Sequence, residues 1–306
     1  MRCLKLQPRA TGTLLLLISA TLAVGQNTTP AVSPTDLVRA TVHSEIKAAN
    51  DPSCARHMFR SRRQTAFGSQ TKLFIETKDG MAGLLLANND QPLTPDQRQA
   101  EEERVERFLN NPGELQKKRK KEKEDADHTL QIMKALPDAF IYEADGTESG
   151  RAGLGRPGEE LVRLNFRPNP KYDPPSRVEQ VLTGMRGHLL IDANRHRIAL
   201  IDGTLFKEVG FGWGILGHLD KGGHFLVQQA DVGDGSWDVT RMSLNFTGKI
   251  LVFKNLKIQS EEVFSDFRAV PANLTFADGL RMLKKEGAVL AENHQGNAAD
   301  KNGGDK

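Results

Sequence analysis

The stretch Leu161–Arg167, with the sequence LVRLNFR, decides the fold class of this chain. Val162, Leu164 and Phe166 alternate with polar residues, so an extended backbone places them on one face and leaves the other face to water. This pattern predicts a half-buried strand of an antiparallel sheet.

Period-two patterns of this kind continue through most of the chain after Pro137. They predict two hairpins and a continuing meander: Leu189–Asp192 with Arg197–Phe206, Phe225–Val232 with Trp237–Phe246, then Ile250–Phe253 and Leu256–Ile258. Short turns join these strands and no β-α-β rhythm is present, so the sheet is predicted to be antiparallel, with helices segregated to one side.

Helices and one more hairpin are predicted on the amino-terminal side. Apolar residues at helical spacing predict a helix over Thr35–Asn50, in which Thr35 and Asp36 are candidate N-caps. Two β-prone runs around Asp79-Gly80 predict a hairpin over 72–87. Thr94-Pro95-Asp96-Gln97 combines an N-cap, a proline and a capping glutamine, and predicts the start of a charged helical pair over 94–136.

The predicted fold class is α+β: a curved antiparallel sheet, or half-barrel, with an N-terminal helix, an inserted helical pair and a short C-terminal helix over Asn273–Lys285. Ile250–Phe253 is apolar on both sides, which is typical of a curved sheet with helices on its concave face and apolar lining left over. We expect a single domain over 35–286. Composition predicts a flexible leader at 26–34 and a disordered tail at 287–306.

The first 25 residues have the layout of a secretory signal peptide. Arg2, Lys5 and Arg9 precede the apolar run Leu14–Val24, and small residues precede Gln26. An apolar run of 11 residues is short for a membrane-crossing helix, which needs roughly 20. We therefore expect cleavage after residue 25, no permanent membrane span, and a periplasmic protein.

Cleavage would change the charge and the cysteine content. The chain has 42 basic and 39 acidic residues, and three of the basic ones lie in the first 25 residues with no acid. The remainder would be neutral, which argues against a nucleic-acid partner. Only Cys54 would remain, so no internal disulfide is expected.

Two motifs resemble cofactor or metal sites. Residues 212–217, GWGILG, match a dinucleotide-binding fingerprint, but no helix is predicted after them, so we interpret them as a glycine-rich bend. His218, Asp220 and His224 offer zinc-ligand atoms at a spacing that fits no standard motif, so we interpret them as a polar turn. We expect no cofactor and no metal, and rank an exported metallohydrolase well below a binding protein.

A cysteine nucleophile is the remaining catalytic possibility. Cys54, with His57 and His43, supplies the residue types of covalent catalysis, but the flanking sequence matches no such enzyme. We interpret Cys54 as a residual thiol and expect that the protein is not an enzyme.

Lys117–Lys123, KKRKKEK, is followed at once by acids. Within three helical turns the segment has almost no apolar residue, so it cannot pack on two sides. It is interpreted as a solvated helix, with an arm that docks an envelope protein as the alternative.

Longer phrases carry a family resemblance: GHLLIDANRHRIALIDGTLF at 187–206, GHLDKGGHFLV at 217–227 and SDFRAVPANLT at 265–275. The chain resembles the periplasmic superfamily that sorts outer-membrane lipoproteins, and is similar to a set of exported bacterial proteins of this type. The resemblance implies a hydrophobic half-barrel, partly covered by helices, that holds acyl chains. It is best over 159–276, and the charged helical pair has no counterpart in it.

The resulting hypothesis is a soluble periplasmic binding or carrier protein for an amphiphilic or lipid-like ligand, for example a lipid or a lipoprotein acyl chain. Apolar burial would drive binding. The predicted pocket rim consists of Phe211, Trp213, Leu216 and Phe225, near the glycine-rich bend. The alternative is a non-enzymatic interaction protein that docks a partner through the arm 94–136.

Overall fold

The computed structural model describes residues 32–302 apart from 52, 212–216, 234 and 251–253. The predicted signal peptide and Trp213 and Leu216 lie outside the described residues. All the helices and strands belong to one unit, Ser33–Lys306.

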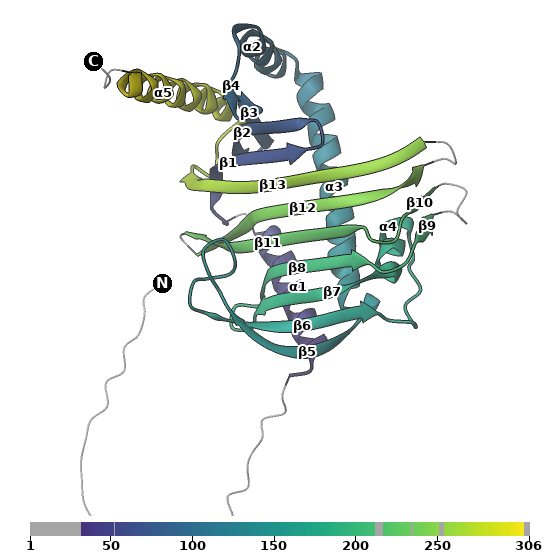
Figure 1. Cartoon of the computed structure of the whole chain (residues 1–306). Coiled ribbons are helices and arrows are strands. Elements are labelled where there is room, and N and C mark those ends of the chain that lie inside the picture. Colours follow the sequence, from purple (N-terminus) through teal and green to yellow (C-terminus); the bar gives the residue numbers. More distant parts are fainter. Residues whose placement is uncertain (1–31, 52, 212–216, 234, 251–253, 303–306) are drawn as a thin grey trace, which may run out of the picture. The chain divides into compact units, whose positions relative to one another are not determined.

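One antiparallel sheet contains every described strand and is not closed into a barrel (Figure 1). Its main path is β4-β3-β2-β1-β13-β12-β11-β8-β7-β6-β5, with β9 and β10 attached beside β12. The strands are β1 (Arg56–Thr65), β2 (Gly68–Thr77), β3 (Gly80–Asn88), β4 (Gln91–Pro92), β5 (Phe140–Ser149), β6 (Glu160–Pro168), β7 (Met185–Asp192), β8 (Arg197–Leu205), β9 (Val209–Phe211), β10 (Gly217–Leu219), β11 (His224–Gly233), β12 (Ser236–Ile250) and β13 (Lys254–Val270). The predicted antiparallel α+β class is confirmed.

The helices begin at the capping residues that local chemistry favours. They are α1 (Pro34–Ala49), α2 (Pro95–Asn110), α3 (Pro112–Ala139), α4 (Arg177–Gln180), the 3-10 turn η1 (Val181–Gly184) and α5 (Phe276–Asn302). Ser33 caps α1, one residue before Pro34, rather than the predicted Thr35 or Asp36. Thr94 and Gln97 form the predicted capping box of α2.

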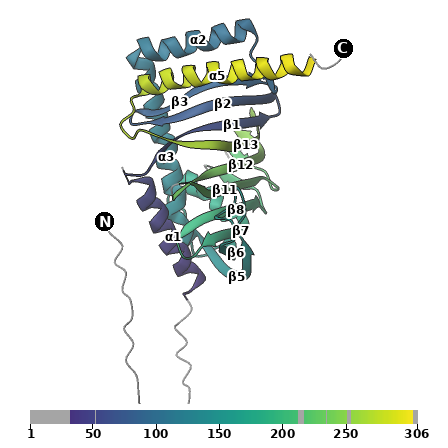
Figure 2. The same cartoon turned by 90° about the vertical axis from the view of Figure 1, so that its left-hand side faces the viewer.

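Two helix-covered cores lie on opposite faces of the sheet. On the first face, named the α1 face, α1 and the end of α3 cover β5–β8, with Val38, Leu136 and Leu189 in the core. On the second, named the α5 face, α5 covers β1–β3, with Ile75 and Leu280 in the core. Figure 2 shows α1 and α3 on the same side of the sheet.

The pairing register shows which side chains share the α1 face. One row of directly paired residues crosses the sheet: Leu189 (β7), Ile201 (β8), Val227 (β11), Met242 (β12), Glu262 (β13) and Arg63 (β1). Paired residues point to the same side of a sheet. The face that carries α1 at one end is therefore continuous with the face that carries Arg63 at the other.

Helix α2 covers the edge of the sheet beside β3. The Glu101 carboxylate accepts a hydrogen bond from the Leu85 N–H at 2.7 Å, and the Arg104 guanidinium donates to the Gly83 carbonyl at 2.6 Å. Edge strands otherwise present unpaired backbone groups that invite aggregation. The inserted helical pair thus satisfies part of one sheet edge.

Three local expectations are corrected. No strand is predicted over 56–65, whereas the structure has β1 there, paired with both β2 and β13. Helix α3 continues past Leu136 through Pro137 to Ala139. Helix α5 is longer than the short helix predicted and continues to Asn302, through most of the segment predicted as a disordered tail.

A buried ion pair joins α1 to β8. The Glu45 carboxylate accepts from the Ile198 N–H at 2.7 Å and lies 3.0 Å from Arg197. Burial raises the pKa of Glu45, while Arg197 and the Ile198 N–H oppose that shift. Removal of one partner leaves the other charge buried and unpaired.

We predict that Glu45→Ala lowers the free energy of unfolding by about 3 kcal/mol, measured by urea denaturation at pH 7. The control is Glu143→Ala, which breaks the exposed Glu143–Arg167 pair at 3.3 Å. It should cost no more than about 0.5 kcal/mol. Equal losses for the two variants would contradict the assignment of Glu45 as an anchor of α1.

Candidate ligand-binding face

The central strands β11, β12 and β13 carry no helix on the α1 face. Among the described elements, α1 and α3 make their close strand contacts with β5 and β8, and α5 reaches only the end of β13, on the α5 face, where Glu286 pairs with Arg268 at 2.7 Å. Helix α3 runs across the strand direction from the α2 end to the α1 end of the sheet (Figure 1). Its residues 123–129 are exposed on every side, so the middle of α3 does not bury the sheet beneath it.

Apolar side chains cover the α1 face of the central strands without being buried. They are Phe225 and Val227 on β11, Met242, Leu244 and Phe246 on β12, and Leu256, Ile258, Phe264 and Phe267 on β13. Each is half-buried except Ile258, which is 37% exposed. We name this set the central apolar face.

Strand glycines make room for aromatic rings on the α1 face. A Cβ on Gly203 would lie 2.4 Å from the Phe225 ring, and one on Gly223 would lie 2.4 Å from the Phe246 ring. Each ring therefore lies against the backbone of a glycine. This arrangement links the central apolar face to the buried core under α1, against which Phe225 and Phe246 pack.

Aromatic residues border the face on the β1 side. The Phe59 ring stacks on Phe267 at 5.3 Å between centroids, and lies 5.7 Å from Phe74 and 6.0 Å from Phe264. Phe59 is buried in this group, whereas its three neighbours are half-buried.

Polar side chains follow beside these rings on the same face. The Ser61 hydroxyl donates to the Glu262 carboxylate, and the Arg63 guanidinium donates to the Ser260 hydroxyl at 2.9 Å. Lys72 pairs in register with Ser61 and is half-buried. Burial, followed by the charge of Arg104, lowers the pKa of Lys72.

The structure places one predicted rim residue on this face. Phe225 lies at its border. Phe211 is at the end of β9 and its side chain is outside the described residues, as are Trp213 and Leu216. Sequence reasoning missed the residues of β12 and β13, although the alternation of Met242, Leu244 and Phe246 carried the signal.

His218, Asp220 and His224, which the sequence analysis interpreted as a polar turn, do not form one group. His218 lies 3.3 Å from Asp220, whereas His224 lies 2.9 Å from Asp202 of β8. Glu208 joins His218 and Asp220, with one ligand atom of each within 4.8 Å of the others.

His57, considered with Cys54 as a catalytic pair, has two acids as its charged neighbours. It lies 3.8 Å from Asp238 and 4.0 Å from Glu76, while Cys54 is exposed.

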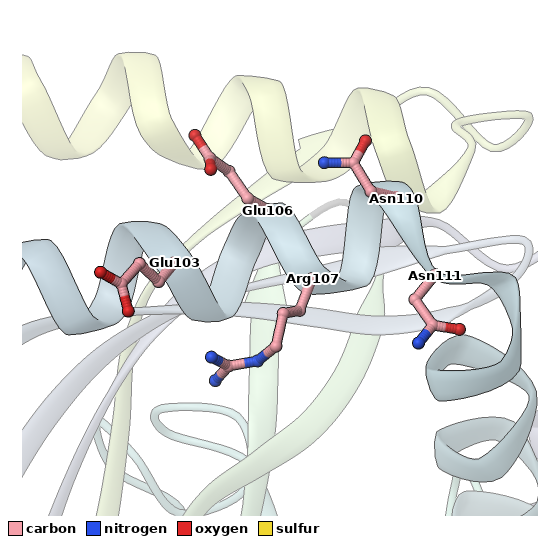
Figure 3. Close-up of a pocket in the computed structure, with 5 residues that line it drawn as sticks. All are labelled: Glu103, Glu106, Arg107, Asn110 and Asn111. Carbon is pink, nitrogen blue, oxygen red and sulfur yellow. The ribbon is translucent and has the colours of Figure 1, made fainter.

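Two depressions elsewhere are open and lined mainly by polar and charged residues. Figure 3 shows the one on α2, where Glu103, Glu106 and Arg107 point in different directions from one helix, near Asn110 and Asn111. The other, of about 440 Å³, lies on the α5 face across β6, β7 and β8. Neither has the apolar lining that an acyl chain needs.

The charged arm is largely compensated within itself. Its lysines pair with acids one turn away: Lys117 with Glu114, Lys118 with Glu122, Lys120 with Glu124 and Lys123 with Asp127. Arg119 pairs with Asp79 at the β2–β3 turn. Exposed pairs of this kind add little stability, but they leave little net positive charge for a partner.

No family model and no curated protein matches this chain. The described helices include none with the length and apolar character that crossing a membrane requires. A solved structure titled "putative outer membrane lipoprotein-sorting protein domain", from Vibrio parahaemolyticus, matches 81% of this chain and 97% of its own, at 10% identity and a TM-score of 0.32.

Proposed function

We propose that this protein binds an amphiphilic, lipid-like ligand whose apolar part lies on the central apolar face, and that it acts as a binding or carrier protein in the periplasm. One observation carries the proposal: the α1 face is apolar across β11–β13, where no described helix packs closely. Contiguous apolar surface that stays exposed marks a binding surface.

The form of the surface favours a flexible chain over a compact ligand. The exposed apolar residues extend along β12 and β13, from the Met242 row to Leu256 at the other end of the strands. Burial of each CH₂ group contributes about 0.8 kcal/mol. Binding on an open face requires no chemistry, which fits the proposal that the protein is not an enzyme.

A partner-docking arm is the alternative function. The intrahelical pairing of Lys117, Lys118, Lys120 and Lys123 gives it less support, because a partner would have to compete with existing acids. Lys120 and Lys123 have side chains at least 76% exposed. Charge reversal there would change an electrostatic docking surface without touching the central apolar face.

Ile258 and Val263 provide a matched pair for testing ligand binding. Both lie on β13, but Ile258 faces the α1 side and Val263, which is 43% exposed, faces the α5 side. Ile258→Asp should weaken binding of a dodecyl-chain amphiphile at least tenfold, since it places a charge in the apolar contact. Val263→Asp should leave affinity within twofold. Isothermal titration calorimetry below the critical micelle concentration measures both.

If the two variants bind the amphiphile as the unmodified protein does, the ligand does not lie on this face. Circular dichroism melts exclude unfolding as the reason for a loss. Native mass spectrometry of the purified protein provides a second test, through a co-purifying lipid that leaves on denaturation.

Reversal of charge on the arm, in Lys120→Glu/Lys123→Glu, should leave amphiphile affinity within twofold, because both residues are on the exposed part of α3. Cross-linking in the periplasm of the source cell then tests the alternative. Loss of a specific cross-linked protein with amphiphile binding retained would favour the docking arm over the carrier.

A further inference from the structure

We propose that the ligand of the central apolar face has an anionic head group, and that Lys72 and Arg63 bind it. The inference rests on the proposed function and names the class of ligand. It starts from the position of these two cations on the α1 face.

The pairing register places the cations within reach of the apolar residues. Lys72 pairs with Ser61, which pairs with Phe264, and Arg63 pairs with Glu262, which pairs with Met242. Neighbouring strands are about 4.8 Å apart, and two strand spacings separate each cationic residue from an apolar residue of the central apolar face. The backbone of each cationic residue therefore lies about 10 Å from the backbone of that apolar residue. Both side chains are long enough to cover much of that distance.

Lys72 is a half-buried cation without a counter-ion among the described residues. Burial is the largest cause of the lowered pKa of Lys72, no hydrogen bond is among its causes, and no carboxylate of the described residues forms an ion pair with its ammonium group. Its charged neighbours include Arg63 and Arg104 as well as Glu101 and Glu262.

Both acids near Lys72 are already engaged. Glu262 accepts from Ser61, and Glu101 binds the Arg104 guanidinium and the Leu85 N–H. Arg63 has only a neutral partner, the Ser260 hydroxyl. A partly buried cation such as Lys72 without its own carboxylate gains most from an external anion, and the exposed Arg63 guanidinium is free to approach the same anion.

The chemistry selects a carboxylate or phosphate ester. The Arg63 guanidinium offers a planar pair of donors that matches two oxygens of such a group, and Lys72 adds a point charge beside it. A cationic head group would be repelled, and an uncharged one would forgo the charge-assisted hydrogen bonds.

The test compares three probes that share a twelve-carbon chain: dodecanoate, uncharged 1-monododecanoylglycerol and dodecyltrimethylammonium. Calorimetry of the full chain at pH 7 should show dodecanoate binding about tenfold tighter than the uncharged probe, with the cationic probe weakest. Lys72→Met and Arg63→Met should each remove most of that preference and leave uncharged binding unchanged. Arg62→Met is the control, because Arg62 lies on β1 next to Arg63 but faces the α5 side and pairs with Asp90.

A pH series gives a readout that unfolding would not imitate. The preference for dodecanoate should decline as pH rises through the lowered pKa of Lys72, and this decline should be absent in Lys72→Met. Guanidinium groups in proteins keep their charge at high pH. A residual preference should therefore remain there, through Arg63.

The outcomes separate this inference from the proposed function. Equal affinity for the three probes overturns the inference of an anionic head group and leaves the proposal of a carrier intact. Failure of all three probes to bind overturns the proposal of a carrier itself. Inorganic phosphate that binds as tightly as dodecanoate would show an anion site independent of the apolar face, and would also overturn the inference.

Discussion

The structure depends on one constraint: the helices that bury this sheet lie on opposite faces at its two ends. A strand that carries apolar side chains needs a layer packed against it. Helices α1 and α3 supply that layer over β5–β8, and α5 supplies it on the other face over β1–β3. One row of paired residues crosses the sheet from β7 to β1. The apolar side chains of the α1 face therefore continue onto β11–β13, beyond the strands that α1 and α3 cover.

Strand β13 joins the two ends of the sheet. It pairs with β12 up to Val263 and with β1 from Ser260 onward, so only a few residues pair on both sides. Beyond Val263, β13 no longer pairs with β12, and the buried His57 of β1 lies between Glu76 of β2 and Asp238 of β12. Burial raises the pKa of both carboxyl groups. This polar group is thus one of the contacts that link the two halves.

Much of the fold was predictable because it is encoded locally. The LVRLNFR strand, the 72–87 hairpin and the Thr94 capping box depend on neighbours within a few residues. Strand β1 was not predictable, because its arginines interrupt the apolar alternation. The acids that pair with them, Asp90 and Asp266, come from other segments of the chain. The same reason applies to the site. Phe225 was predicted from a local bend, whereas the other residues of the central apolar face share a surface only once the register between strands is known.

The pairing of β1 with β13 also has a consequence for how the chain folds. Ser61 and Glu262, which meet across this pair, are 201 residues apart in sequence. The β1–β4 meander can form early from local contacts, but it can join the remaining strands only when the last strand of the chain is present. Contacts with such a long sequence separation slow folding. The closing step is therefore expected to limit the rate, and until then the unpaired edges of β1 and β12 are exposed to other chains.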